Sequence, residues 1–176
     1  MDAVPALQET DRVRGPLSAA LLLMTYGDYQ CPQSGKAHRA TEKLRQSLGD
    51  RLCFVFRHFP QPKIYPQSKK AAETAEAAGS QGKFWEMHDK LFENQQNLDD
   101  ASLVEYADEL GLDVPQFLQE LGYHVHAARI KADIDSAHQY GVEASPTFFI
   151  SVRHKDINNL EDMIQKILAI ATVQGQ

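Results

Sequence analysis

Residues 21–34 read Leu21-Leu22-Leu23-Met24-Thr25-Tyr26-Gly27-Asp28-Tyr29-Gln30-Cys31-Pro32-Gln33-Ser34. The first six form a largely apolar run, typical of a strand buried on both faces, and a Gly-Asp pair ends it. The proline after the cysteine suits the first turn of a helix, and apolar residues then recur at helical spacing: Ala37, Ala40, Leu44 and Leu48. The stretch therefore predicts a buried strand that passes, through a turn at the cysteine, into a helix ending near Gly49.

A second strand is predicted directly after this helix. Residues 51–59 are rich in aromatic and β-branched side chains, and Pro60 and Pro62 close the run. Two strands joined by one helix form a βαβ unit, whose right-handed crossover makes the strands parallel neighbours in one sheet. We expect the helix that begins beside Cys31 to lie against one face of this sheet.

The middle of the chain is predicted to be helical. From Pro66 to about Tyr140, alanine-rich and leucine-rich stretches repeat at a period of 3.6 residues, broken by glycines. The pattern predicts about five helices. Asp99 or Asp100 is expected to cap one of them, and Asp113 begins the next.

The start of the chain differs from the rest. Residues 1–16 are polar, show no period and end in a Gly-Pro pair, so they are predicted to be an N-terminal arm. This leaves residues 17–176 as a single domain, with a helical insertion at about 65–140.

The end of the chain is predicted to complete the sheet and cover it. Residues 147–150 predict a short strand, and residues 151–154 an arm that pairs back as a hairpin. Residues 160–170 have one apolar face and predict a final helix.

Composition narrows the function classes. With 176 residues, 43% of them hydrophobic, the chain has the size of one domain with a core. Its net charge of -6 disfavours a nucleic-acid partner, because phosphates attract basic proteins. The longest apolar stretch, residues 17–24, is far below the roughly 20 residues of a membrane span. The polar start lacks the basic and apolar run of a secretory signal, so we expect a cytoplasmic protein.

Four motifs resemble those of one family. They are the turn at 26–34, Phe56-Arg57-His58-Phe59-Pro60, Gly82-Lys83-Phe84-Trp85-Glu86-Met87-His88 and Ser145-Pro146-Thr147-Phe148-Phe149-Ile150. With the predicted order of elements, they resemble the DsbA-like thioredoxin-fold proteins from about Gly15 to Met163. The resemblance implies an α/β fold: a thioredoxin-like mixed central sheet of βαβ and ββα units, with the helical insertion of the DsbA type.

Cys31 is the candidate nucleophile. It stands on the turn into a helix, whose unpaired amide groups and dipole favour a negative charge, so its thiolate is expected to be stabilised. The alternative is a small buried core residue, as cysteines often are. In the family that this turn resembles, a Cys-x-x-Cys motif stands here, which implies that Pro32 and Gln33 lie against the substrate.

Pro146 is the second part of the site that the resemblance implies. A cis-proline faces the active-site cysteine in thioredoxin folds, and the alternative is a trans proline that opens an edge strand. The chain at Ala144 and Ser145 would then offer backbone groups to an extended peptide, as in strand addition. Ser145 and Thr147 are therefore further candidates for substrate binding.

Three positions bear on the chemistry. Ser34 replaces the second cysteine of the motif, and its hydroxyl cannot attack a mixed disulfide as a resolving thiolate does. Thr25 stands where many members of the family carry an acidic residue. An engineered Cys-to-Ser substitution, made to trap a mixed disulfide, would change position 34 alone. The accompanying Thr25 therefore favours a natural single-thiol protein. Cys53, in a strand buried on both faces, is expected to fill the core rather than pair with Cys31.

These residues predict a thiol–disulfide oxidoreductase that works through one thiol on protein or peptide thiols and disulfides. Glutathione or a partner's thiol would supply the resolving step, and no other cofactor is expected. The alternatives are a redox-inactive module that binds peptides or proteins beside Pro146, and a protein that dimerises through a Cys31 disulfide. No metal site is expected, because His124 and His126 lie two residues apart, which does not bring side chains together on a helix.

Overall fold

The computed structural model describes residues 4–152 and residue 165. Its elements, in chain order, are β1 (Arg12–Arg14), β2 (Leu21–Gly27), α1 (Pro32–Leu48), the 3-10 helix η1 (Gly49–Arg51), β3 (Leu52–His58), α2 (Ser68–Ser80), α3 (Phe84–Glu93), α4 (Asp100–Glu109), α5 (Val114–Gly122), α6 (Ala127–Gln139) and β4 (Thr147–Val152). Within this part of the chain, no helix is long and apolar enough to cross a membrane.

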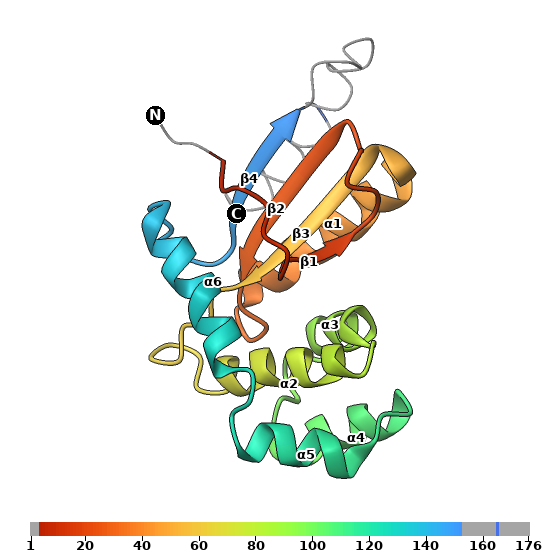
Figure 1. Cartoon of the computed structure of the whole chain (residues 1–176), viewed down its shortest axis with the longest axis vertical. Helices are drawn as coiled ribbons and strands as arrows, with labels where there is room; N and C mark the ends of the chain where they lie inside the picture. The colour runs from red at the N-terminus through yellow and green to blue at the C-terminus, as the bar shows by residue number, and fades with distance from the viewer. Residues whose placement is uncertain (1–3, 153–164, 166–176) are drawn as a thin grey trace.

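One mixed sheet, in the strand order β1-β3-β2-β4, forms the centre of the fold. β2 and β3 run parallel, with Leu21 opposite Leu52 and Gly27 opposite His58. The predicted βαβ unit is therefore confirmed, and β4 pairs antiparallel on the other side of β2. Figure 1 shows that β2 and β3 both end toward the helical insertion, so the turn that holds Cys31 lies between sheet and insertion.

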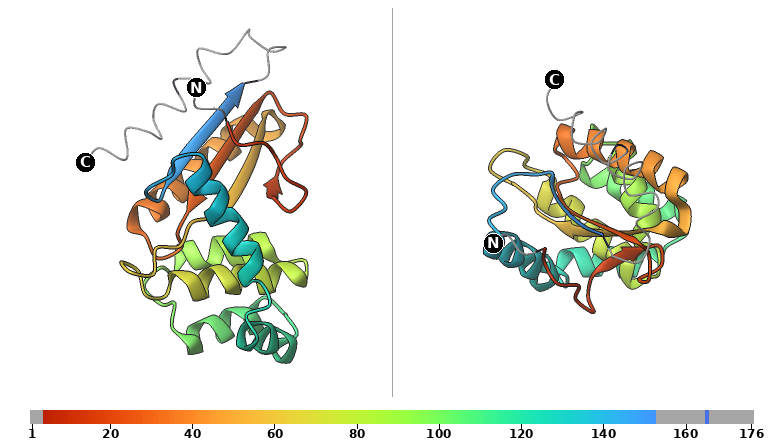
Figure 2. Two further views of the ribbon diagram at one scale, coloured as in Figure 1. Left: turned by 60° about the vertical axis from the view of Figure 1, so that its left-hand side comes forward. Right: turned by 90° about the horizontal axis from the view of Figure 1, so that it is seen from above.

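The sheet carries an apolar core on each face, because side chains alternate along the buried strands. Leu23 and Phe54 belong to a cluster with residues of α1, α2 and α3. Met24 and Val55 belong to a second cluster, which includes Ala137 of α6. Figure 2 shows α1 and α6 on opposite sides of the sheet accordingly.

The helical insertion follows its sequence signals. Five helices, α2 to α6, separate β3 from β4, as predicted. The Asp99 side chain accepts hydrogen bonds from the first amides of α4, and Asp113 caps α5 in the same way. Gly141, with φ 72°, follows the end of α6 in the left-handed conformation that ends many helices. Local capping therefore explains where α4 and α5 begin and where α6 ends.

The sheet begins earlier than the sequence analysis expects. Residues 1–16 were predicted as an arm, but Arg12–Arg14 form β1, which pairs antiparallel with β3. The two arginines of β1 pair with Glu76 and Asp89, which belong to the insertion. A strand with charged side chains lacks the apolar pattern of a buried strand, and the acidic partners that neutralise it lie far along the chain.

The prediction of a hairpin after residue 150 is wrong for residues 151 and 152. Both belong to β4, which continues until Val152 lies opposite Leu21 at the start of β2. β2 offers a long edge of backbone groups, so its partner gains ladder hydrogen bonds by continuing rather than by turning. Residues 153–154 and the predicted final helix, apart from residue 165, lie outside the described residues.

Candidate active site

Cys31 occupies the N-cap position of α1. Its backbone is extended (φ -72°, ψ 121°), and Pro32 is the first helical residue. The Cys31 amide donates to the Asp28 carbonyl at 3.2 Å, and the Cys31 carbonyl accepts from the Gly35 amide at 3.1 Å. The sulfur is thus held at the positive end of a helix of 17 residues, with the residue 2% exposed.

A segment from the far end of the described chain meets this cysteine. The Ser145–Pro146 peptide bond is cis. The Cys31 thiol donates a hydrogen bond to the Ser145 carbonyl, with 3.4 Å between sulfur and oxygen. The Ser145 hydroxyl donates to the side-chain oxygen of Gln61 at 3.0 Å. The fold therefore brings Cys31, Ser145 and Pro146 together from opposite ends of the domain.

Ser34 supports the turn. The residue is 2% exposed, and its hydroxyl oxygen accepts a hydrogen bond from the Asp28 amide at 3.2 Å. A hydroxyl at this position has no thiolate with which to attack a disulfide on Cys31.

The remaining predicted substrate-binding residues lie near the cysteine. Pro32 and Gln33 are exposed at the start of α1. Thr147, half-buried at the start of β4, donates its hydroxyl to the Ala144 carbonyl at 2.7 Å. This bond shapes the segment around Pro146, while Pro32 and Gln33 offer accessible surface to a partner.

Asp28 is a buried carboxylate that links two loops of the site. It accepts hydrogen bonds from the amides of Gln30 and Gln61, both at 2.8 Å. Burial raises the pKa of Asp28, and the hydrogen bonds from backbone amides oppose the rise. Because Gln61 also bonds Ser145, Asp28 positions the Pro146 segment indirectly as well as the cysteine turn.

Two further residues of the site have no local sequence motif. Gln95, in the loop after α3, donates through Nε2 to the carbonyls of Tyr29 and Cys31, both at 2.8 Å. Gly35 makes room for this amide, since a Cβ at that position would lie 2.0 Å from Gln95 Oε1. Tyr65, before α2, hydrogen-bonds the Cys31 side chain, which together with burial raises the pKa of the tyrosine hydroxyl. The sequence offered one signal of this contact, namely that a glycine, Gly35, stands inside the first turns of a helix.

Cys53 lies away from this site, as the sequence analysis expects. It is 2% exposed and belongs to the core cluster that faces α6. The active-site turn follows the end of β2 that lies beside His58, five residues further along β3 from Cys53. At about 3.3 Å per residue, this places Cys53 roughly 16 Å from that end of the sheet. A disulfide needs Cα atoms within about 7 Å, so Cys53 fills the core.

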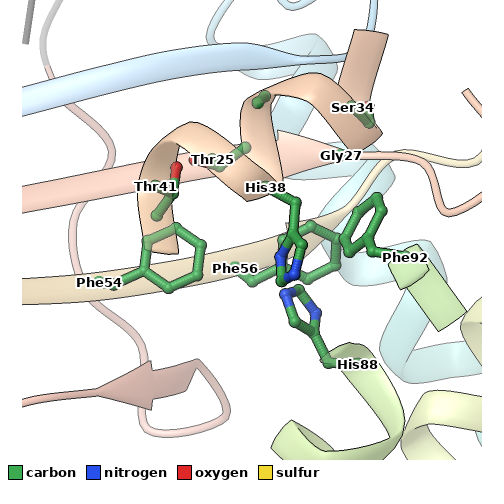
Figure 3. A pocket seen from close by; sticks show the side chains of 10 residues that line it. Thr25, Gly27, Ser34, His38, Thr41, Phe54, Phe56, His88 and Phe92 are labelled. Atoms are coloured by element: carbon green, nitrogen blue, oxygen red, sulfur yellow. The ribbon is translucent and has the colours of Figure 1, made fainter. Parts of the chain in front are cut away.

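A small cavity lies beneath the first turns of α1 (Figure 3). It holds ≈ 10 Å³, about the room of one water molecule. Thr25, Ser34, His38 and His88 line it together with aromatic rings. Thr25 is 6% exposed, and its hydroxyl has no hydrogen-bond partner among the described residues. The position that carries an acid in many DsbA-like proteins thus holds an unsatisfied hydroxyl here.

A family model described as thioredoxin matches residues 7–169. The chain belongs to the thioredoxin family. A thioredoxin-like oxidoreductase from Silicibacter pomeroyi DSS-3 is similar with a TM-score of 0.74 at 22% identity, over 92% of this chain and 94% of that chain. α-DsbA1 from Wolbachia pipientis is similar with a TM-score of 0.73 at 21% identity, over 97% of this chain and 96% of that one. The DsbA-like thioredoxin fold is therefore confirmed.

Curated relatives of this thioredoxin-family chain are longer proteins. The Na(+)/H(+) antiporter NhaA 1 of Salinispora arenicola (strain CNS-205) is 41% identical over 159 residues, which are 90% of this chain and 24% of that protein. The Na(+)/H(+) antiporter NhaA of Herminiimonas arsenicoxydans is 39% identical over 149 residues, 85% of this chain and 24% of that protein. The chain spans about a quarter of the length of the curated relatives it matches.

Proposed function

We propose that this thioredoxin-family protein is a thiol–disulfide oxidoreductase that acts through the Cys31 thiol alone. One observation carries the proposal: the Cys31 sulfur, at the N-terminus of α1, hydrogen-bonds the Ser145 carbonyl beside the cis Pro146, while position 34 holds a hydroxyl. A cysteine in this setting is able to form a mixed disulfide, and a serine is unable to resolve it.

The reaction has two exchange steps. The Cys31 thiolate attacks the glutathione sulfur of a protein–glutathione disulfide, so that a Cys31–glutathione disulfide forms and the protein leaves as a thiolate. A second glutathione thiolate then attacks the bound glutathione sulfur, which yields glutathione disulfide and regenerates Cys31. The protein substrate gains the two electrons that the disulfide product has lost. A thiol of a partner protein serves in place of glutathione in the same scheme.

The residues around Cys31 offer hydrogen-bond partners both to its thiol and to its thiolate. The thiol donates to the Ser145 carbonyl at 3.4 Å. The thiolate accepts from the Tyr65 hydroxyl, and it lies at the positive end of the α1 dipole. The segment at Ala144, exposed beside Pro146, offers backbone groups to an extended peptide. These contacts support binding of protein or peptide thiols at this surface.

Two assays on three proteins test the proposal. The wild type is compared with Cys31→Ala and Ser34→Cys in the reduction of a peptide–glutathione disulfide by glutathione, and in the reduction of insulin. We expect the wild type to catalyse the reduction of the peptide–glutathione disulfide and Cys31→Ala to lose this activity. Insulin reduction is expected to rise at least tenfold in Ser34→Cys, because the second thiol resolves the mixed disulfide internally.

The second candidate function is a binding module without turnover. Burial of Cys31, 2% exposed, and the replacement of an acid by Thr25 favour it, since both limit access and proton movement at the thiol. If the wild type reduces the glutathione disulfide no faster than Cys31→Ala, the oxidoreductase proposal fails. Equal binding of an extended peptide by these two proteins would then support the module.

A further inference from the structure

Three metal-ligating side chains meet between α1 and α3. They are His38 of α1 and the neighbouring His88 and Asp89 of α3, whose ligand atoms all lie within 4.8 Å of one another. Figure 3 shows the two imidazole rings next to each other below α1, and they meet edge to face with 5.3 Å between their centroids. We propose that His38, His88 and Asp89 bind a divalent transition-metal ion such as Zn²⁺. The spacing of histidines in the sequence does not predict this site, because α1 and α3 are separated by a strand and a helix.

The distances suit one ion. His38 Nε2 lies 3.9 Å from Asp89 Oδ1. Zinc bonds to nitrogen and oxygen of about 2.0–2.2 Å place two ligand atoms of a tetrahedral site roughly 3.4 Å apart. Atoms within 4.8 Å of one another therefore converge on one ion through small side-chain rotations.

His88 is held in the orientation of a ligand. Its Nδ1 hydrogen-bonds the Tyr29 hydroxyl at 2.9 Å, which leaves Nε2 for the ion. The ring is packed against Phe56 and Phe92, with centroid distances of 4.5 and 5.1 Å. A hydrogen bond to the second ring nitrogen is the usual means by which proteins orient a metal-binding histidine.

The charges around the site permit binding. Burial lowers the pKa of His38 and that of His88. Both oxygens of Asp89 accept from Arg14, at 3.1 and 2.7 Å. The ion takes the place of one of these bonds, and Arg14 keeps its contact with Glu42 at 3.2 Å.

The cavity supplies the fourth ligand position. His38 and His88 line the cavity of ≈ 10 Å³, which has about the room of one water molecule. The hydroxyl of Thr25, which has no hydrogen-bond partner among the described residues, lines the same cavity and offers a partner to a water there. His38 also lines a surface groove, which gives an ion a path to the site; two carboxylates, Glu42 and Glu93, and two cations, Arg39 and Lys43, border this groove.

Zinc titration of the metal-free full chain tests the site. Calorimetry and thermal unfolding are measured with Zn²⁺ on the wild type, on His38→Ala and on Asp89→Asn, each also in a Cys31→Ser background to exclude binding by the thiol. His124→Ala is the matched control, because that ring lies elsewhere, hydrogen-bonded to Glu73. Circular dichroism establishes that each variant is folded.

We expect one Zn²⁺ per chain and a rise in melting temperature on binding. His38→Ala and Asp89→Asn are each expected to weaken binding at least tenfold, since even residues that only orient a ligand cost about 10- to 100-fold. His124→Ala and Cys31→Ser should bind as the wild type does. Unchanged affinity in folded His38→Ala or Asp89→Asn, or equal loss in His124→Ala, would overturn the proposal.

Discussion

The substitution Glu76→Gln should destabilise the fold strongly. Glu76 of α2 is buried, with its side chain 1% exposed. Its carboxylate accepts from Arg12 of β1 through both oxygens, one of them at 3.3 Å, and from His58 Nε2 at the end of β3 at 2.8 Å. One carboxylate therefore joins the edge strand, the central sheet and the insertion.

The size of the expected loss in the free energy of unfolding follows from the burial of the Glu76 carboxylate. Removing one partner of a buried ion pair costs about 3–5 kcal/mol, because the other charge stays buried and unpaired. Glutamine keeps the shape of the side chain, so no cavity adds to the cost, and Arg12 is 29% exposed, so water compensates part of its charge. We therefore expect about 3 kcal/mol. At roughly 2–4 °C per kcal/mol for a chain of this size, the melting temperature should fall by about 6–12 °C.

Urea unfolding at pH 7, followed by circular dichroism, measures the effect. The control is Glu105→Gln, an exposed carboxylate on α4, for which we expect a change within about 0.5 kcal/mol. A loss below about 1 kcal/mol in Glu76→Gln would refute the reasoning.

The pH dependence gives a second readout of the same carboxylate. Burial raises the pKa of Glu76, but the hydrogen bonds and charges of His58 and Arg12 outweigh it and hold the pKa well below its ordinary value of 4.5. A depressed pKa means that the unfolded chain binds the proton first, so this contribution is present above about pH 4.5 and is lost as the pH falls further. The difference between wild type and Glu76→Gln should therefore shrink below that pH.

Three further substitutions test the positioning of the site and the core. Gln95→Ala removes the hydrogen bonds to the Tyr29 and Cys31 carbonyls. It should lower the free energy of unfolding in urea by about 1–3 kcal/mol and change the rate of Cys31 alkylation. If neither quantity changes, Gln95 does not position the turn. Gly35→Ala places a Cβ 2.0 Å from Gln95 Oε1, so it should lower the free energy of unfolding less in a Gln95→Ala background than in the wild type. If the effects of the two substitutions simply add, the steric contact between them is excluded. Phe117→Ala, at a position 0% exposed in α5, should cost about 3–5 kcal/mol in the same measurement, and a cost under 1 kcal/mol would mean that the insertion repacks.

Prediction from sequence succeeded where the signal is local. The apolar run of β2, the Pro32 that begins α1 and the Asp113 that caps α5 each mark an element through neighbouring residues. It failed at β1, whose arginines gain their partners from the insertion, and at the end of β4, whose length depends on the edge that β2 presents. In both cases the deciding contact lies outside any local window.

By itself, the sequence determined that a cysteine stands at the start of a helix between two parallel strands, and that position 34 holds a hydroxyl instead of a second thiol. Periodicity and helix capping act between residues a few positions apart, so they are legible without a structure. The family resemblance implied that Pro146 faces Cys31, but only the tertiary structure showed that the Ser145 carbonyl bonds the Cys31 thiol across 114 positions of the chain, and that Gln95 bonds the same turn. The pairing of His38 with His88 and Asp89 was likewise decided by packing. These contacts arise when separate elements pack together, and packing leaves no periodic trace in the order of residues.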